Sequence, residues 1–507
     1  MLTGISEALL NAAALASAFV LVYTLLNKFS KTAPLPPGPR KLPLIGNLLD
    51  IPREREWVTF TEWAAKWGDI VSVSVLGEHM IILNTAQAAF EMLDKKSAKF
   101  SDRPVLELAG EIVGWKNTVI LLPYGEEFRA QRKAFHQAIG SKNSMSHYYP
   151  IVEKETHKFL KRVLAEPVLL DRHVRRMSAA ILIRITYGYE LQEGQDPLLT
   201  LAEDATAALA LSTAPTVFMV NVIPALRYVP AWLPGGGYKN IGAKWAKIFD
   251  ELVNRPYEWV KKQMKLGTAN PSVTSRLLDE TAELTPERER HIKWSAASLY
   301  GGGADTTMPS IITLFLAMAL YPDVMRKAQE EIDAVIGQDR LPSFSDRENL
   351  PYTNALVLEI ARWHTVAPTA VHHSSMEDDI YNGYLIPKGA MIIPNIWYML
   401  HDPKVYPDPF EFKPERFLGP NPEPDPYDVC FGFGRRICPG RVLADASVFL
   451  SCAMSLAVFN ITKLSENGET ITPIHEQLTG SISQLKPFKC AITPRSSQAQ
   501  VLIDSEI

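Results

Sequence analysis

The sequence is poor in cysteine: its 507 residues contain only four, at positions 430, 438, 452 and 490. So few thiols cannot form the disulfide framework of a chain this long, and they suit a reducing compartment in which one cysteine is committed to chemistry. The sequence also lacks a strong excess of one charge, because its formal net charge is -4 and no lysine- or arginine-rich run occurs. This balance gives no support to a nucleic-acid-binding function.

The glycine-rich signatures of nucleotide sites are missing as well. No Walker phosphate-binding loop occurs, and the nearest approach to a dinucleotide-binding turn, Gly432-Phe433-Gly434, lacks the third glycine. Internal repeats and low-complexity segments are also absent from the sequence. With no flavin or nicotinamide site in the chain, the electrons for a reductive reaction would have to come from a separate protein.

The N-terminus contains a long uncharged stretch. Residues 8–26 carry no charge and are about long enough to cross the hydrocarbon core of a membrane. Positive charges follow this stretch instead of preceding it, which favours a retained anchor over a cleaved signal peptide. We therefore predict a single-pass anchor over residues 1–33, with the bulk of the protein in the cytosol. A cleaved signal remains the alternative, because Ala14-Leu15-Ala16 resembles a cleavage site.

The remaining sequence predicts one mainly α-helical domain with a small β region. Residues 34–43 are rich in proline, cannot be helical and predict a short, stiff hinge, which leaves residues 44–507 as the catalytic domain. Alternating patterns predict a hairpin over residues 70–84, turning at Gly77, and further strands over residues 380–393. A hydrophobic fraction of 47% is sufficient for a large core.

Two further features bear on the membrane. The segment 228–235 is unusually apolar for a loop, so it is either a buried turn or a loop that enters the membrane surface, where tryptophan is favoured. Asn460-Ile461-Thr462 is a glycosylation sequon, and it should stay unmodified if the domain is cytosolic.

One long helix is predicted to start at Thr285-Pro286, a hydroxyl cap followed by a first-turn proline, and to end before Pro322. Its interior contains three consecutive glycines, residues 301–303, each of which costs roughly 1 kcal/mol relative to alanine. Such a cost indicates that something approaches the backbone there or that the helix opens. Pro309 adds to this expectation, because it cannot donate a hydrogen bond to the carbonyl of Asp305.

The most informative stretch is residues 431–440, in which Cys438 stands between glycine turns and before an apolar segment, 442–459, that predicts a helix. A thiolate at a helix N-terminus accepts backbone N–H donors and faces the positive end of the dipole, so we expect a lowered pKa. Gly434 and Gly440 would allow tight turns and close approach to a flat ligand, and Arg436 could neutralise an acidic group on it. These are the requirements for holding haem iron by one axial sulfur. The alternative is a buried structural cysteine.

The fixed positions Phe431, Gly434, Arg436, Cys438 and Gly440 resemble the haem-binding loop of the cytochrome P-450 family. The resemblance extends from the proline-rich segment to this loop, and is strongest to membrane-anchored enzymes of fungal secondary metabolism. It implies a cytochrome P-450-type domain that binds haem b, with the Cys438 thiolate as the metal ligand and the other four residues as cofactor-binding residues.

The same resemblance assigns roles elsewhere. The segment 301–307 resembles the family's central helix, in which Thr306 would hydrogen-bond to dioxygen and Asp305 would relay protons from solvent. Arg132 and His373 resemble contacts to the haem propionates. The family commonly has tryptophan where this chain has Phe128, so one donor to the cofactor is lost.

A further resemblance concerns structure and not catalysis. Glu359 and Arg362 match the family's Glu-x-x-Arg pair, and Arg416 matches the partner that completes a Glu–Arg–Arg network behind the haem loop. By itself, a glutamate three residues before an arginine on a helix is a common surface ion pair.

The implied activity is that of a haem–thiolate monooxygenase at the endoplasmic reticulum membrane, which inserts one oxygen atom from O₂ into a lipophilic small molecule. Electrons would come from NADPH through NADPH-cytochrome P-450 reductase, with cytochrome b5 as a second candidate donor. A terpenoid or sterol-like substrate is expected, because the segments expected to form the walls of its site are mostly apolar: residues 104–122, 205–222, 294–299, 366–371 and 478–482.

Two other functions remain open. An isomerase or dehydratase would use the same haem without O₂ or a reductase, but the Asp305-Thr306 pair argues against it. A non-catalytic haem-binding sensor would need neither the apolar walls nor the proton relay. The basic residues Arg129, Lys133, Arg435 and Arg441 are either a docking face for an acidic partner or ordinary solvated charges.

Overall fold

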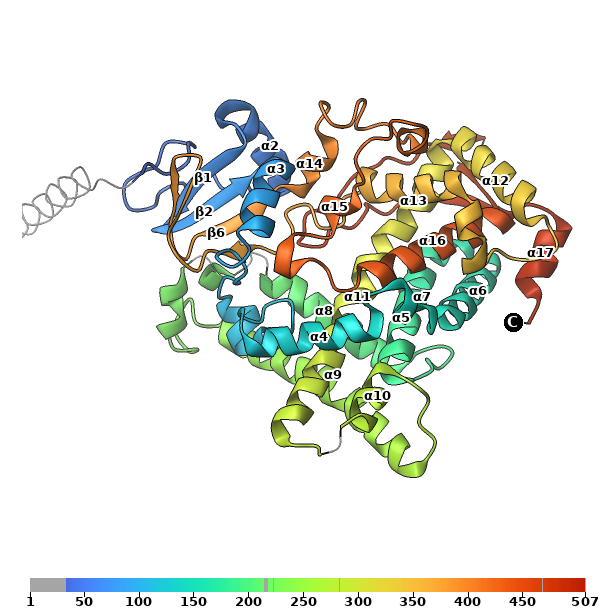
Figure 1. The fold of residues 1–507 in the computed structure, drawn as a ribbon, viewed down its shortest axis with the longest axis horizontal. Coiled ribbons are helices and arrows are strands. Elements are labelled where there is room, and N and C mark those ends of the chain that lie inside the picture. Colours follow the sequence, from blue (N-terminus) through green and yellow to red (C-terminus); the bar gives the residue numbers. More distant parts are fainter. Residues whose placement is uncertain (1–32, 214–217, 222, 282, 467, 507) are drawn as a thin grey trace, which may run out of the picture.

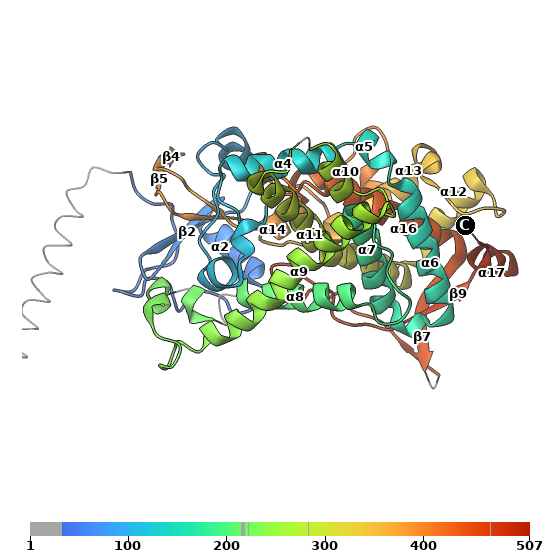
Figure 2. The ribbon, with the colours of Figure 1, turned by 90° about the horizontal axis from the view of Figure 1, so that it is seen from below.

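The computed structural model describes residues 33–213, 218–221, 223–281, 283–466 and 468–506. Except for its last residue, the predicted anchor over residues 1–33 lies outside the described residues. The described chain is mainly helical with small sheets, as the sequence predicts. In Figures 1 and 2 the largest sheet lies at one end of the domain, and the C-terminal helix lies at the other.

Ten of the helices in the described part of the chain have at least twelve residues. They are α2 Glu56–Trp67, α4 Glu126–Ile139, α6 Tyr149–Ala165, α7 Leu170–Tyr187, α8 Pro197–Thr213, α9 Tyr238–Leu266, α11 Pro286–Leu320, α12 Pro322–Ile336, α13 Pro351–Trp363 and α16 Arg441–Val458. Short helices connect them: α3 Ala86–Ala89, α5 Lys142–Ser146, α10 Val273–Asp279, α14 Ile396–His401, α15 Tyr427–Cys430 and α17 Ser497–Asp504. Two π-helical segments, η1 Phe90–Lys95 and η2 Glu107–Val113, lie between α3 and α4.

The four-stranded sheet has the order β1-β2-β6-β3. Its first two strands, β1 Ile70–Val75 and β2 Glu78–Leu83, form the predicted hairpin, and Gly77 at the turn has a φ of 95°. The predicted strand region 380–393 contains β4 Asp379–Tyr381, β5 Tyr384–Ile386 and β6 Met391–Pro394. Strand β6 pairs in parallel with β2 and antiparallel with β3 His373–Ser374. The sheet therefore joins segments about 300 residues apart.

A second sheet near the C-terminus was not predicted from the sequence. It has the order β8-β7-β9 and consists of β7 Phe459–Glu466, β8 Glu469–Ile471 and β9 Cys490–Pro494. Asn460 of the sequon is half-buried in the central strand β7, where it pairs with Thr493. Its glycosylation state therefore reports little on which side of the membrane the domain lies.

Helix α11 forms the centre of the domain (Figure 1). The Thr285 hydroxyl caps its start by accepting a hydrogen bond from the Arg288 backbone N–H at 3.2 Å, and Pro322 follows its end, as expected. The helix packs against α4, α7, α9 and α16. By length and composition α11 and α16 could each span a membrane, but most of both helices is buried in this core.

The proline-rich segment packs on the domain instead of standing free as a hinge. The carbonyl of Pro37 accepts a hydrogen bond from Ser72 in β1 at 2.9 Å, and that of Pro34 accepts one from Leu385 in β5 at 2.8 Å. A Cβ built at Gly38 would lie 2.1 Å from the Ser72 carbonyl oxygen, so only glycine allows this approach. From Pro34 onward the chain is therefore attached to the four-stranded sheet and to the separate two-stranded sheet of β4 and β5.

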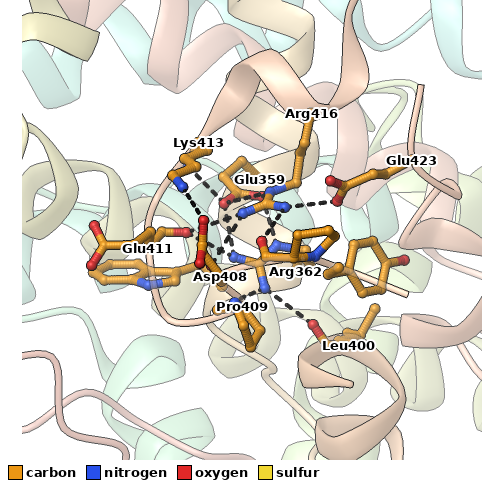
Figure 3. A network of polar contacts seen from close by, with 12 residues as sticks. Glu359, Arg362, Leu400, Asp408, Pro409, Glu411, Lys413, Arg416 and Glu423 are labelled. Carbon is orange, nitrogen blue, oxygen red and sulfur yellow. Dashed lines mark hydrogen bonds and ion pairs between the residues drawn. The ribbon is translucent and has the colours of Figure 1, made fainter. Parts of the chain in front are cut away.

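The Glu–Arg–Arg residues meet in a buried network between α13 and the segment after α14 (Figure 3). Arg362 forms two hydrogen bonds to the Glu359 carboxylate, at 2.7 and 2.8 Å, and Arg416 approaches the same group at 3.1 Å. Arg362 also donates to the carbonyls of Leu400 and Pro409, at 3.1 and 2.7 Å. The side chains of Glu359 and Arg362 are fully buried. One carboxylate thus ties α13 to the chain that leads into the cysteine loop.

The first prediction concerns this carboxylate. Glu359→Gln leaves two buried guanidinium groups without it, so we expect a loss of roughly 3–5 kcal/mol in the free energy of unfolding, measured by urea denaturation. Lys413→Gln is the matched control, because it breaks only the exposed 2.6 Å ion pair with Asp408. That control should cost less than about 1 kcal/mol. Equal losses in both variants would contradict the prediction.

Candidate functional site

A mostly apolar cavity of about 320 Å³ lies between α11 and the cysteine loop. Thr306 of α11 and Cys438 of the loop both line it. All five segments that were expected to form apolar walls contribute side chains to the cavity. In chain order the lining residues from these segments are Trp115, Thr118, Val119, Ile120, Leu209, Ser298, Leu299, Val366, Ala367, Ala370, Val371 and Ile482. This is the size and character of a small-molecule site.

The cysteine loop is closed by backbone contacts. The Cys438 N–H donates to the Phe431 carbonyl at 2.7 Å, and α16 begins three residues after the cysteine, as the apolar pattern predicts. Gly434, with a φ of 53°, packs against η1, where an added Cβ would lie 2.1 Å from the Leu93 carbonyl oxygen. Gly434 is therefore needed for packing against the protein's own backbone. Gly440 has a φ of −88°, so no turn requires glycine there.

Burial raises the pKa of the Cys438 thiol, contrary to the lowering expected from the helix terminus. The Gly440 N–H and the charges of Arg132 and Arg441 oppose this rise, but desolvation is the larger effect. A buried thiolate therefore needs a positive partner such as a metal ion. Burial also raises the pKa of Cys430, a second thiol, which ends α15 and lines the same cavity.

Three arginines line the cavity without a carboxylate partner among the described residues. Arg436 donates to the carbonyls of Ser101 and Leu122, both at 2.7 Å, and Arg132 donates to that of Ile437 at 2.6 Å. The third, Arg103, donates to the carbonyls of Ile120, Val371 and His372, at 2.9, 2.6 and 2.8 Å. These contacts place three cations at one cavity.

Desolvation acts on each of these cations. It lowers the pKa of Arg436 to about 10 and depresses the pKa values of Arg103 and Arg132, and the mutual repulsion of Arg103 and Arg436 adds to the effect at Arg103. Asp102 offsets part of this effect at Arg103 and Arg436 without forming an ion pair, so the wall formed by the three arginines is still suited to an anionic ligand.

Phe128 and His373 adjoin these cations. The Arg436 guanidinium carbon lies 3.8 Å from the centroid of the Phe128 ring, a cation–π contact, so phenylalanine supports an arginine at the position where a tryptophan donor was expected. His373 lines the cavity and shares a 2.7 Å hydrogen bond with the Phe100 carbonyl through Nδ1, which leaves Nε2 for a ligand. Burial and the nearby Arg103 hold the pKa of His373 well below its usual value.

The residues present fit haem. A porphyrin has an apolar face, two carboxylates and a metal that takes one axial sulfur. The cavity has apolar walls, three arginines without an ion pair among the described residues and a half-buried thiol. Each part of the cofactor would remove a specific cost of the folded protein, namely exposed apolar surface, uncompensated cations and a desolvated thiolate.

The expected proton-relay residues lie on different sides of α11. Thr306 lines the cavity, and its hydroxyl donates to the Gly302 carbonyl at 3.1 Å. Asp305 is not among the lining residues; it forms an ion pair with Arg175 of α7, whose side chain is one-third exposed. The carboxylate therefore lies between the threonine and solvent.

The glycines of α11 do not open the helix, which continues through residues 301–303 and Pro309. A Cβ at Gly303 would lie 2.8 Å from Leu182 of α7, whereas one at Gly302, which lines the cavity, would meet no protein atom within 4 Å. Close helix packing thus accounts for Gly303, and access to the cavity wall accounts for Gly302.

Two residues of this site, Arg103 and Arg175, were not identified from the sequence. Arg103 precedes Pro104 and the apolar segment 104–122, so an isolated cation at the start of a predicted wall was the available signal. Arg175 lies among several charged residues in α7, and nothing in its local sequence distinguishes it from a solvated surface residue.

Comparison with known proteins identifies close relatives. Residues 36–490 match the family model described as Cytochrome P450. The chain is 51% identical to cytochrome P450 monooxygenase 208 of Postia placenta, over 94% of this chain and 93% of that protein. It is 47% identical to cytochrome P450 monooxygenase claR of Ampulloclitocybe clavipes, over 96% and 91% of the two chains, and 42% identical to cytochrome P450 monooxygenase ppsD of Aspergillus oryzae, over 93% and 91%.

The second prediction separates the two loop glycines. Gly434→Ala forces a Cβ into the Leu93 carbonyl at a left-handed backbone position, so the loop must move away from η1. We expect a loss of roughly 2–3 kcal/mol in the free energy of unfolding and a preparation depleted in haem. Gly440→Ala places its Cβ 3.8 Å from the Cys438 sulfur, an ordinary contact, and should retain both properties. Unfolding by urea and haem content per chain are the measurements, and similar behaviour of the two variants would refute the distinction.

Proposed function

The chain belongs to the cytochrome P450 family, and from this premise we propose that it inserts one oxygen atom from O₂ into a lipophilic small molecule with electrons from NADPH. Proteins of this family bind haem through a cysteine thiolate, and the relatives above are monooxygenases. The observation that carries the proposal is a cavity with the half-buried Cys438 on one wall and Thr306 of α11 on another. The relatives' activity also favours it over the isomerase and sensor alternatives.

The bound haem would supply the redox chemistry that activates O₂. In our proposal Cys438 provides its axial thiolate, Arg103, Arg132 and Arg436 bind its carboxylates, and His373 contributes a further polar contact. Phe431 and Gly434 shape the loop that presents the sulfur, and Gly440 faces that sulfur with its backbone N–H. The Glu359–Arg362–Arg416 network would support this loop from behind. It holds the segment that ends at Leu418 against α13, and the cysteine loop begins thirteen residues later.

Protons would reach the reaction through the outer side of α11. Asp305 takes a proton from solvent as its ion pair with Arg175 exchanges, and Thr306 holds the proton at its hydroxyl on the cavity side. The apolar walls exclude bulk water, so proton delivery depends on this short route.

Electrons would come from a membrane-bound reductase that uses NADPH, with cytochrome b5 as a second candidate. Arg129, Lys133, Arg435 and Arg441 are exposed around the cysteine loop and the start of α4. None of them forms an ion pair within the described part of the chain. This surface would be complementary to an acidic partner.

We further propose a single-pass anchor over residues 1–33 in the endoplasmic reticulum membrane, with the domain of residues 44–507 in the cytosol. The loop 228–235 is not a buried turn, because Trp232 is 81% exposed and Tyr228 is 74% exposed. Leu44, near the N-terminal end of the domain, is 94% exposed. In Figures 1 and 2 these segments lie toward the same end of the domain, which would face the lipid.

Digestion of the domain by protease added to intact microsomes would support this topology, and protection would contradict it.

The substrate would be a terpenoid or a sterol-like molecule. Side chains lining the cavity above α11 are mostly aliphatic or aromatic, and the charged ones are the arginines assigned to the cofactor, together with Asp445, which pairs with Arg347 at 2.6 Å. A rigid hydrocarbon skeleton would fill a cavity with such walls, and the ligand would lose little conformational freedom on binding.

The third prediction tests the sulfur ligand. Cys438→Ser should lose the red-shifted absorption band that the reduced protein shows with carbon monoxide, because a serine oxygen cannot replace the thiolate. Cys430→Ser is the matched control, since Cys430 lines the same cavity, and it should keep the band. A band that survives in the Cys438 variant and disappears in the Cys430 variant would move the ligand to the other thiol.

The fourth prediction tests the proton route. Thr306→Val removes the cavity-side hydroxyl, so with reductase and a lipophilic substrate we expect the product formed per NADPH to fall by roughly 10²-fold. Thr313→Val removes a buried hydroxyl of the same helix that bonds to the Pro309 carbonyl at 2.7 Å and does not line the cavity. Product yield per NADPH, measured with released peroxide, should stay normal in this control. Unchanged coupling in the Thr306 variant would remove that residue from the proposed route.

A further inference from the structure

Three histidines lie together outside the residues that the proposed chemistry uses. His364 directly follows α13, His401 ends α14, and His475 begins a segment of residues 475–486 that we name the C-terminal loop. The His364 and His475 rings have centroids 5.8 Å apart, and His475 stacks on Trp363 at 3.8 Å with planes at 18°. His401 is close enough to the other two for their charges to interact. The three rings therefore form one cluster.

The C-terminal loop is attached to the domain at this cluster. Nε2 of His364 shares a 3.1 Å hydrogen bond with the Ser483 carbonyl, and the Ser483 N–H donates to the Val366 carbonyl at 2.8 Å. The Gln477 amide donates to the Thr365 carbonyl at 3.0 Å. A segment held by a few hydrogen bonds opens more readily than the packed core.

The loop also forms part of the cavity wall. Ile482, the residue before Ser483, lines the cavity, and Val366, to which the loop is bonded, lines it as well. On the other side of the loop, Leu478, Thr479 and Ser481 are exposed to solvent. Opening of the loop would thus take Ile482 out of the wall.

A positive charge on these rings has no partner while the loop is closed. Nδ1 of His364 and Nε2 of His475 are buried and form no hydrogen bond with the described residues. A second proton on either ring would be a buried donor without an acceptor, which is unfavourable. The nearby Arg362 guanidinium repels a charge on His401 and His475 as well.

The charged groups on the surrounding elements do not remedy this. The other cations on those elements are Arg55 before α2, whose N–H donates to the Thr479 hydroxyl at 3.1 Å, Arg416, and Lys486 of the loop itself. The carboxylates are engaged elsewhere: Glu359 with Arg362 and Arg416, Glu476 with Lys486 at 2.9 Å, Glu56 with the Thr369 hydroxyl at 3.2 Å, Asp402 with the Lys404 N–H at 3.0 Å, and Glu411 with the Tyr321 hydroxyl.

The neutral rings therefore favour the closed loop. Burial lowers the pKa of His364 to about 4, that of His401 to about 3 and that of His475 to about 2. A hydrated histidine has a pKa of about 6.5. The closed form thus keeps its full stability above about pH 6.5, and loses it as the pH falls toward about 4, because only the opened form takes up protons in this range.

We propose that His364, His401 and His475 form an acid-sensitive latch, which keeps the C-terminal loop closed while the rings are neutral and releases it when they are protonated. Release removes Ile482 from the wall and opens the cavity to solvent on that side. The inference does not depend on the proposed oxidation chemistry, because these three histidines are not among the residues that line the cavity.

The test is amide hydrogen exchange of the haem-loaded full chain at pH 7.5 and pH 5.5, read by mass spectrometry and divided by the intrinsic exchange rate at each pH. Each histidine that becomes hydrated on opening makes opening about tenfold more favourable at the lower pH. We therefore expect protection of residues 476–486 to fall by roughly 100-fold or more, since at least His364 and His475 become hydrated. Helix α12, which contains no histidine, is the internal reference, and its protection should change by less than about threefold.

A double variant removes the two titrating rings next to the loop. His475→Phe keeps an aromatic ring on Trp363, and His364→Gln keeps an N–H donor for the Ser483 carbonyl. In this variant the fall in protection should shrink to at most about tenfold, the share of His401. His147→Gln, which replaces an exposed histidine, is the matched control and should keep the wild-type pH dependence.

The proposal is overturned if the loop of the wild type loses no more protection than α12, or if the double variant keeps the full pH dependence. Should the double variant fail to retain haem, the two single variants take its place. Each of them should then lose about one tenfold step of the pH dependence, and an unchanged dependence in both would equally overturn the proposal.

Discussion

Three arginines that line one cavity and form no ion pair with any described carboxylate are the constraint on which the rest of this structure depends. Arg103, Arg132 and Arg436 come from three separate segments and direct their donors to backbone carbonyls. Desolvation lowers their pKa values, so the folded chain by itself holds these cations at a cost. A ligand with two carboxylates removes this cost only in the folded state, and therefore stabilises that state by mass action. Folding and cofactor binding are linked through this electrostatic deficit.

The contrast with the Glu359 network shows that the deficit is local. Arg362 and Arg416 are just as buried, yet one carboxylate and several carbonyls satisfy them. The same fold thus gives its buried arginines a bonded carboxylate where they join segments, but only carbonyls and the more distant Asp102 where they line a cavity. Burial alone does not separate a structural arginine from a ligand-binding one. The charges around an arginine separate the two kinds better than its burial does.

The sequence predicted those features that depend on local pattern. The hairpin at Gly77, the ends of α11 and the helix after Cys438 follow from turn residues, caps and apolar periodicity, and the structure has all three. Features set by distant contacts were missed or misjudged. Gly434 is required by the backbone of Leu93, some 340 residues earlier, and the thiol pKa is raised by burial that no local motif encodes.

The site residues divide in the same way. Cys438, Arg436 and Thr306 lie in recognisable motifs, whereas Arg103 and Arg175 acquire their partners only when distant segments meet. The exposure of Trp232 was also undecided from sequence, because an apolar loop is equally compatible with a buried turn.

Helix α11 presents different side chains to the cavity and to solvent because successive residues of a helix point about 100° apart. Gly301 supports the Trp115 ring, Thr306 lines the cavity, and Asp305 turns outward to Arg175. These three positions span little more than one turn, so a shift of the helix would disturb all of them at once. The continuous packing of α11 against α7 and α16 is what keeps an indole ring, a hydroxyl and a solvent-linked carboxylate in fixed relation. Because a cavity left incomplete in charge can gain its missing contacts only from a bound ligand, the wall that faces the ligand has to be rigid.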